Sequence, residues 1–138
     1  MGDVAVREAR PTDGEALARA WTDGGRYYVQ LDPEIFQVPE GEALVRFFTE
    51  RPRQLGEGRA LFVAEVGAEV VGWVSAVIEP PVQHAEFQLQ RELGSVRAHV
   101  NAVMVQEDHR GRGVGTALMR HVEAWARDQG AVMISLDT

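Results

Sequence analysis

The feature that most constrains this chain is an arginine- and glycine-rich loop between a β-rich run and an amphipathic helix. It reads HRGRGVGT and spans His109 to Thr116. Glycines lack the Cβ atoms that would hold a ligand away from the backbone, so successive N–H groups can converge on phosphate oxygens at the positive end of a helix dipole. Arg110 and Arg112 add positive charge. The loop therefore predicts a pyrophosphate-binding site at the start of a helix.

Two other phosphate-binding loops do not fit this sequence. A dinucleotide-binding G-x-G-x-x-G loop opens an early βαβ unit and precedes an acidic residue by about 20 positions, whereas this loop comes late in the chain. A Walker loop ends in Gly-Lys-Ser or Gly-Lys-Thr, which is absent here. A tight strand-to-helix turn remains the alternative for Gly111, Gly113 and Gly115, and a surface salt bridge remains the alternative for Arg110.

The rest of the sequence alternates β-rich and helical segments. Apolar residues recur with period two in the strands and every three or four positions in the helices. Strands are expected over residues 4–8, 59–66, 70–78, 96–105 and 131–136, and helices over 15–28, 43–51 and 114–126. Thr12 or Asp13 is expected to cap the first helix, and Pro52 to end the second. Gly24-Gly25 interrupts the apolar stripe of the first, which is interpreted as one helix or two short ones.

This order of elements, β-α-α-β-β-β-α-β, indicates an α/β (α+β) fold. Residues 82–94 show little periodicity and are interpreted as an inserted loop or short helix. Strict alternation along residues 96–105 sorts them into two faces. One face, wholly apolar, carries Ala98, Val100, Ala102 and Met104. The other carries His99, Asn101, Val103 and Val105. The last run, AVMISL, is typical of a buried strand.

Length and composition narrow the class of protein. At 138 residues the chain can build one hydrophobic core but not two ordinary domains, so residues 1–138 are expected to form a single domain. The absence of cysteine excludes disulfides and thiolate metal ligands, and we expect no metal and a cytoplasmic location. No secretion signal or membrane-spanning run is visible. A formal net charge of −7 argues against nucleic-acid and anionic-membrane partners.

The loop and the strand before it resemble the acetyl-CoA-binding motif of the GNAT family of N-acetyltransferases. That motif is Arg or Gln, two residues, Gly, one residue, then Gly or Ala, which Arg110, Gly113 and Gly115 match. Val105 stands five residues before the arginine, as in the family, and the hairpin VAEVGAEVVGWVSA, with Gly72 after an aliphatic pair, is similar to the family's second and third strands. The resemblance implies a mixed central sheet flanked by helices, with acetyl-CoA as the cofactor.

The resemblance also implies which residues would contact acetyl-CoA. The backbone of Val103, Met104 and Val105 would pair with the pantetheine arm and the acetyl carbonyl. Backbone amides and two arginines would hold the pyrophosphate, and the residues concerned are Arg110, Gly111, Arg112, Gly113, Val114, Gly115 and Thr116. The implied reaction is transfer of the acetyl group to a primary amine of a small molecule or peptide by direct attack.

Direct attack needs a neutral amine, whereas an amine with a pKa of about 10.4 is almost fully protonated at pH 7. A base, or a water chain to one, therefore helps. His99 lies six residues before Val105, where some branches of the family carry a glutamate base, and it is a candidate for this role. Asn101 could orient a water or the substrate. A hydrogen-bonded structural histidine is the alternative for His99.

Three further residues are candidates for binding the acceptor. Tyr27 and Tyr28 follow the first helix, where the family often places acceptor contacts, although packing at a helix end is the alternative for both. His84 lies with Glu86 in the segment 82–94, which is expected to face the acceptor cleft, and a solvated loop is the alternative for that pair.

The chain ends soon after the run over residues 131–136. The family's next helix, whose tyrosine commonly protonates the leaving thiolate, and its last two strands have no counterpart within these 138 residues, so we expect either a truncated domain or a protein that works without them. A CoA-binding module with impaired catalysis is therefore the alternative function. A final strand left open on one side exposes unpaired N–H and C=O groups, so we expect a homodimer through this edge.

Overall fold

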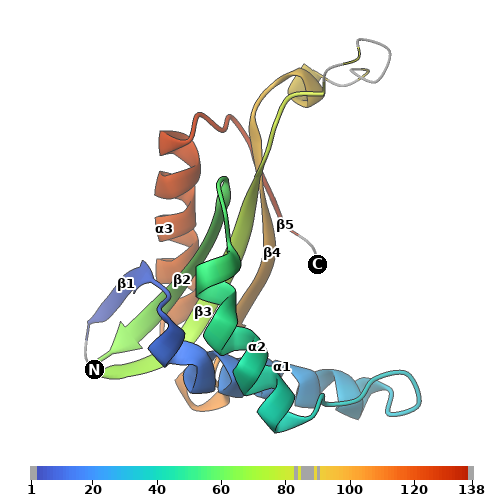
Figure 1. Cartoon of the computed structure of the whole chain (residues 1–138), viewed down its shortest axis with the longest axis vertical. Helices are drawn as coiled ribbons and strands as arrows, with labels where there is room; N and C mark the ends of the chain where they lie inside the picture. The colour runs from blue at the N-terminus through green and yellow to red at the C-terminus, as the bar shows by residue number, and fades with distance from the viewer. Residues whose placement is uncertain (1–2, 83, 85–88, 90, 137–138) are drawn as a thin grey trace.

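The computed structural model describes residues 3–82, 84, 89 and 91–136, and shows a five-stranded sheet with helices on both faces (Figure 1). The strands are β1 (Val4–Glu8), β2 (Arg59–Val66), β3 (Glu69–Glu79), β4 (Arg97–Val105) and β5 (Ile134–Leu136). The helices are α1 (Gly14–Leu31), α2 (Gly41–Gln54) and α3 (Val114–Asp128). Short 3-10 turns are η1 (Pro11–Asp13), η3 (Arg91–Gly94) and η4 (Glu107–His109). The expected element order and α/β class are confirmed.

The sheet is mixed, and each face has its own core. The strands lie in the order β1-β2-β3-β4-β5, antiparallel as far as β4, with β5 parallel to β4. Residues of α3, including the fully buried Leu118 and Val122, pack on one face. Leu17 of α1 and Phe48 of α2 pack with Trp73 on the other. Burying one such aliphatic side chain contributes about 2 kcal/mol, so neither layer of helices is dispensable.

A bulge in β4 shifts the alternation of its side chains. Ala102 and Val100 pair with consecutive residues of β3, which leaves Asn101 without a partner across from it. The residues that pack in the core on the α3 side are Val100, Val103 and Val105. Those that pack in the core on the α1 side are Ala102 and Met104. The single apolar face expected from strict alternation is therefore wrong, because one extra residue moves every later side chain to the opposite face.

Helix α1 continues without interruption through Gly24-Gly25, so the segment is one helix and not two short ones. A Cβ on Gly24 would lie 2.9 Å from Sδ of Met104 on β4. This glycine therefore lets α1 approach the sheet closely, and the packing it allows outweighs its low helix propensity. As a result, Tyr27 and Tyr28 lie within the last turns of α1 instead of following it.

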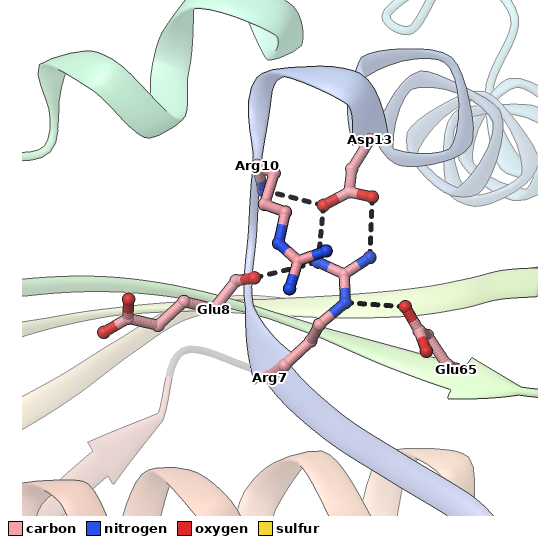
Figure 2. Close-up of polar contacts among 5 residues, drawn as sticks. All are labelled: Arg7, Glu8, Arg10, Asp13 and Glu65. Carbon is pink, nitrogen blue, oxygen red and sulfur yellow. Dashed lines mark hydrogen bonds and ion pairs between the residues drawn. The ribbon is translucent and has the colours of Figure 1, made fainter.

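Asp13 stands at the N-cap position of α1, but its side chain makes no capping hydrogen bond. It instead accepts hydrogen bonds from both terminal nitrogens of Arg7, each at 2.9 Å, and from the N–H of Arg10 at 2.7 Å (Figure 2). Nε of Arg7 donates to Glu65 at 2.6 Å. Burial raises the pKa of Asp13, but the hydrogen bonds from Arg7 and Arg10 outweigh it and hold this pKa below its ordinary value. The network ties the start of α1 to β1 and β2.

The C-terminal run is more exposed than its sequence predicts. β5 pairs with residues 98–100 of β4, and it is the last strand of the described sheet. Val132, Met133 and Leu136 are 71%, 46% and 49% exposed. The expectation of a buried strand over residues 131–136 is therefore wrong, since a strand at the edge is paired along one side alone. Association of two chains through this edge stays a prediction.

Two other boundaries differ in detail from the expectation. Pro52 lies in the last turn of α2, which runs on to Gln54, although its ring nitrogen has no hydrogen to donate to the helix, so the proline does not end α2 where the sequence predicts. The segment 82–94 contains the short turn η3, and the N–H of Val82 donates to the carbonyl of Leu93 at 2.7 Å. Glu86 lies outside the described residues. Across the parts of the chain that are described, no helix is both long and apolar enough to cross a membrane.

Candidate functional site

The glycine loop begins where β4 ends, and hydrogen bonds hold this junction in place. Gln106 is 5% exposed; its N–H donates to the carbonyl of Val71 at 2.8 Å, and its Nε2 donates to the carbonyl of Val70 at 3.1 Å. The N–H of Glu107 donates to the carboxylate of Asp23 on α1 at 3.0 Å. The loop therefore starts from a point that is held by both β3 and α1.

The loop presents a row of unpaired backbone amides. Gly111 and Gly113 adopt φ angles of 75° and 83°, a left-handed conformation that favours glycine. The first hydrogen bond of α3 runs from the N–H of Ala117 to the carbonyl of Gly113 at 3.0 Å. Within the described residues, the six amides of residues 111–116 donate no hydrogen bond to a protein acceptor. They lie at the positive end of the α3 dipole, where an anion is stabilised.

The space in front of these amides is open. A Cβ added to Gly111, Gly113 or Gly115 would meet no atom within 4 Å. A cavity of about 280 Å³ lies here, and the residues that line it are Val105, His109, Arg110, Gly111, Gly113, Val114, Gly115 and Thr116. The shape and the donor set fit a pyrophosphate, because bare glycine backbone lets phosphate oxygens approach the N–H groups directly.

The neighbouring part of β4 has an open edge. β5 pairs with residues 98–100, and no described strand pairs with residues 101–105 on that side. Because the N–H of Gln106 donates to Val71, antiparallel alternation turns the backbone groups of Met104 toward β3 and those of Val103 and Val105 toward the open side. An extended, amide-containing ligand could therefore pair with Val103 and Val105.

The two arginines of the loop lie in different places, one beside β4 and one at the exposed tip. Nε of Arg110 donates to the carbonyl of Val105 at 3.2 Å, so this side chain lies at the open edge of β4. Arg112 is exposed at the tip of the loop. His109, which the sequence did not single out, lines the same cavity, and its buried Nδ1 has no hydrogen-bond partner among the described residues.

A second cavity, of about 570 Å³, opens on the α1 and α2 side of the sheet. We refer to it as the acceptor cavity. Its lining residues are Trp21, Pro39, Leu44, Phe47, Phe48, Arg51, Leu55, Arg59, Leu61, Trp73, Ser75, Asn101 and Ala102. The bulge residue Asn101 thus lies at its wall, next to the open edge of β4.

Tyr28, Tyr27 and His99, the other candidates from the sequence, lie at different distances from the acceptor cavity. Tyr28 lines an adjoining cavity of about 250 Å³, which shares Trp21 and Pro39 with the acceptor cavity. Tyr27 contacts Tyr28 edge-on, with ring centroids 5.7 Å apart, and is 54% exposed. Nδ1 of His99 lies 2.7 Å from Oγ of Ser135 on β5.

His84 belongs to the connection between β3 and β4. This connection lies beyond the Glu79–Arg97 end of the hairpin, whereas the glycine loop follows Val105 at the other end (Figure 1). The strand between these ends is nine residues long, about 30 Å. His84 therefore lies far from the glycine loop. In the described part of the chain, no three histidine, aspartate or glutamate side chains gather as a metal site would require.

The lining of the acceptor cavity is largely absent from the sequence-based prediction. Arg51, Arg59, Phe47 and Trp73 come from α2, β2 and β3, and no local motif connects them. The signal that could have indicated them is compositional: arginines next to aromatic residues on segments that precede the glycine loop. Such a signal identifies no site until the fold brings the segments together.

The family of the chain follows from comparison with known sequences. The model of the Acetyltransferase (GNAT) family matches residues 15–138, which include both cavities and the glycine loop. This chain belongs to the GNAT acetyltransferase family. N-acetyltransferase 8B of Rattus norvegicus is 39% identical over 83 residues, 59% of this chain and 32% of that protein. The chain spans about a third of the length of the curated relatives it matches first.

Solved structures give the same fold. A tetramutant of the BH1408 protein from Bacillus halodurans superposes with a TM-score of 0.82 at 19% identity, covering 97% of this chain and 82% of that one. A ribosomal-protein-alanine N-acetyltransferase from Brucella melitensis superposes with a TM-score of 0.63 at 19% identity, covering 99% and 80%. The expected GNAT-like mixed sheet flanked by helices is therefore confirmed.

Proposed function

We propose that this chain transfers an acetyl group from acetyl-CoA to a primary amine of a small molecule or peptide. The observation that carries the proposal is the row of six unpaired amides, residues 111–116, beside the open edge of β4. A pyrophosphate and an amide-containing arm require these two kinds of partner next to each other. Membership of the GNAT family supports the same donor.

The donor half of the site acts through backbone. The amides of residues 111–116 would hold the pyrophosphate, and Arg110 and Arg112 would add charge around it. The open N–H and C=O groups of Val103 and Val105 would pair with the pantetheine arm. Acetyl-CoA supplies the activated thioester: a C–N bond to the amine forms while the C–S bond breaks, the amine releases one proton, and the sulfur takes one up.

Residues near the acceptor cavity would remove the proton of the amine. Strand alternation puts His99 on the face opposite Val100, which is the face of α1 and the acceptor cavity. The contact of its Nδ1 with Ser135 fixes the ring orientation. We propose that His99 accepts the proton through water, as a general base, and that Asn101 orients the amine or that water.

The test combines binding and turnover on the purified chain. We expect acetyl-CoA and CoA to raise the melting temperature, and a panel of primary amines to release thiol from acetyl-CoA in step with formation of the acetylated amine. Stabilisation by both nucleotides without thiol release for any amine would indicate a CoA-binding module instead. Absence of stabilisation by either nucleotide would refute the donor site itself.

A further inference from the structure

The acceptor cavity carries charge of the opposite sign to the chain as a whole. The chain has a formal net charge of −7, yet the charged residues lining this cavity are Arg51 on α2 and Arg59 at the start of β2. Among the described residues, neither guanidinium has a carboxylate within 4 Å. Two arginines without acidic partners at one cavity are suited to a carboxylate, which arginine binds in a forked geometry.

The same cavity has an aromatic wall. Trp21 stacks on Trp73 with ring centroids 6.1 Å apart, and Phe48 lies 5.4 Å from Trp73. Nε1 of Trp73 already donates to the carbonyl of Leu17 at 3.1 Å, so the indole has no need of a polar ligand. Phe47, which is 54% exposed, adds apolar surface at the rim. This wall suits an aromatic or large aliphatic group.

The part of the cavity wall that comes from β4 lies next to the open edge of that strand, where the acetyl group is expected. Asn101 and Ala102 line it, and they directly precede Val103, the first residue of β4 with backbone groups turned to the open edge. An amine held beside Asn101 would therefore lie next to the acyl end of the donor site. The volume, about 570 Å³, lies within the range of small-molecule sites.

Resting on the acetyl transfer proposed above, we propose that the acceptor is an amino acid with an aromatic or large aliphatic side chain. Its amine faces Asn101, its carboxylate binds Arg51 and Arg59, and its side chain packs on the wall formed by Trp21 and Trp73. Polyamines and other dications are disfavoured, because the arginines repel them and the described lining contains no carboxylate.

The first arm of the test separates the carboxylate from the rest of the acceptor. Initial rates of thiol release are compared for phenylalanine, phenethylamine and alanine, which carry respectively ring and carboxylate, ring alone, and carboxylate alone. We expect kcat/KM for phenylalanine to exceed both others by at least tenfold. Equal values for phenylalanine and phenethylamine would overturn the proposal while leaving acetyl transfer intact.

The second arm removes the arginines. In Arg51→Ala and Arg59→Ala, kcat/KM for phenylalanine should fall toward that for phenethylamine, so that the tenfold ratio between the two amines disappears. Arg53→Ala is the matched control, since Arg53 lies on the same helix, is 65% exposed and pairs with Glu50. An equal loss with both amines would contradict carboxylate recognition. Stabilisation by acetyl-CoA, measured on every variant, shows whether the donor site is intact.

A third arm needs no turnover. Trp21 and Trp73 lie in the cavity wall, so binding of N-acetylphenylalanine should change tryptophan fluorescence. We expect this product to bind at least tenfold more tightly than N-acetylphenethylamine, and Arg51→Ala and Arg59→Ala to remove the difference. Equal affinities for the two acetylated products would refute the proposal, even if the chain releases no thiol. Failure of acetyl-CoA to stabilise the chain would refute the proposed function instead.

Discussion

The proposed donor half and the proposed acceptor half of this site are built in different ways. The donor half is made of backbone: six amides of residues 111–116 and the open groups of Val103 and Val105, all within fourteen consecutive residues. The acceptor half is made of side chains from α1, α2, β2, β3 and β4. A backbone site needs glycine and local geometry, whereas a side-chain site needs the completed tertiary fold. The two halves should therefore respond differently to substitution.

The largest effect is expected where a side chain invades the backbone site. Gly115→Glu places a carboxylate in the open space before the amides, while Gly115 already has a helical conformation that other residues adopt. We expect acetyl-CoA affinity to fall by about 100-fold, roughly 3 kcal/mol, with little change in melting temperature. Isothermal titration measures the loss, and Gly115→Ala is the control. Undiminished binding in Gly115→Glu would show that the cradle lies elsewhere.

The acceptor half should depend on distant supports of α1. In Asp13→Asn, the partly buried guanidinium of Arg7 keeps Glu65 but loses the more buried of its two charged partners, and we expect a loss of about 2 kcal/mol in the free energy of unfolding at pH 7. Because the folded-state pKa of Asp13 is lowered, this stabilisation is complete above the pKa of the unfolded chain, about 3.9, and disappears as pH falls below it through the folded pKa.

Urea unfolding at pH 7, 5 and 3 measures this effect. The difference between wild type and Asp13→Asn should be the same at pH 7 and 5 and smaller at pH 3. Glu50→Gln, in an exposed pair with Arg53, is the matched control, and its effect should be within about 0.5 kcal/mol. A difference that grows on acidification would rule out this account of the network.

A smaller effect is expected at the proposed base. His99→Gln keeps a polar side chain opposite Ser135 but cannot accept a proton. We expect kcat to fall at least about tenfold, against the roughly 100-fold or more that a general base typically contributes. The KM for acetyl-CoA should not change. A variant that keeps the wild-type kcat would leave His99 a structural residue.

The smallest effect is expected for Arg112, and it separates the contribution of side-chain charge from that of backbone in the donor half. Arg112 is an exposed side chain beside a site made of backbone, so Arg112→Ala should weaken acetyl-CoA binding only about threefold. The loss should shrink further at high salt, since exposed charges are screened. Affinities measured at low and high ionic strength test this. A loss as large as that in Gly115→Glu would mean that side-chain charge, not backbone, dominates the donor half.

The sequence predicts the position of the glycine loop in the fold, between β4 and α3, because the information for it is local. The spacing from Val105 through Arg110 to Gly113 and Gly115 lies in one segment, and the structure puts those glycines at the start of α3. The element order and the hairpin of β2 and β3 follow from periodicity and turn residues in the same way. A local pattern suffices wherever a few neighbouring residues decide the conformation.

The sequence predicts the acceptor half poorly because its information is distributed. Arg51 and Arg59 acquire a shared environment only when α2 packs against the sheet. Gly24 is a helix breaker by propensity, yet contact with Met104 makes it a point of close approach. Asp13 is a residue type that often caps helices, but its carboxylate binds Arg7. In each case a tertiary contact overrides a local preference.

The bulge at Asn101 gives β4 two phases of side-chain direction along a single strand. Val100, before the bulge, packs in the core on the α3 side, whereas Ala102 and Met104, which are also even-numbered, pack in the core on the α1 side. A scan of single-residue deletions along β4 would make this visible. Removing Asn101 would leave Val100 and Ala102 opposite Ala76 and Ser75 and keep Ala102 and Met104 on their present side, so this deletion should be tolerated better than deletion of a paired residue of β4.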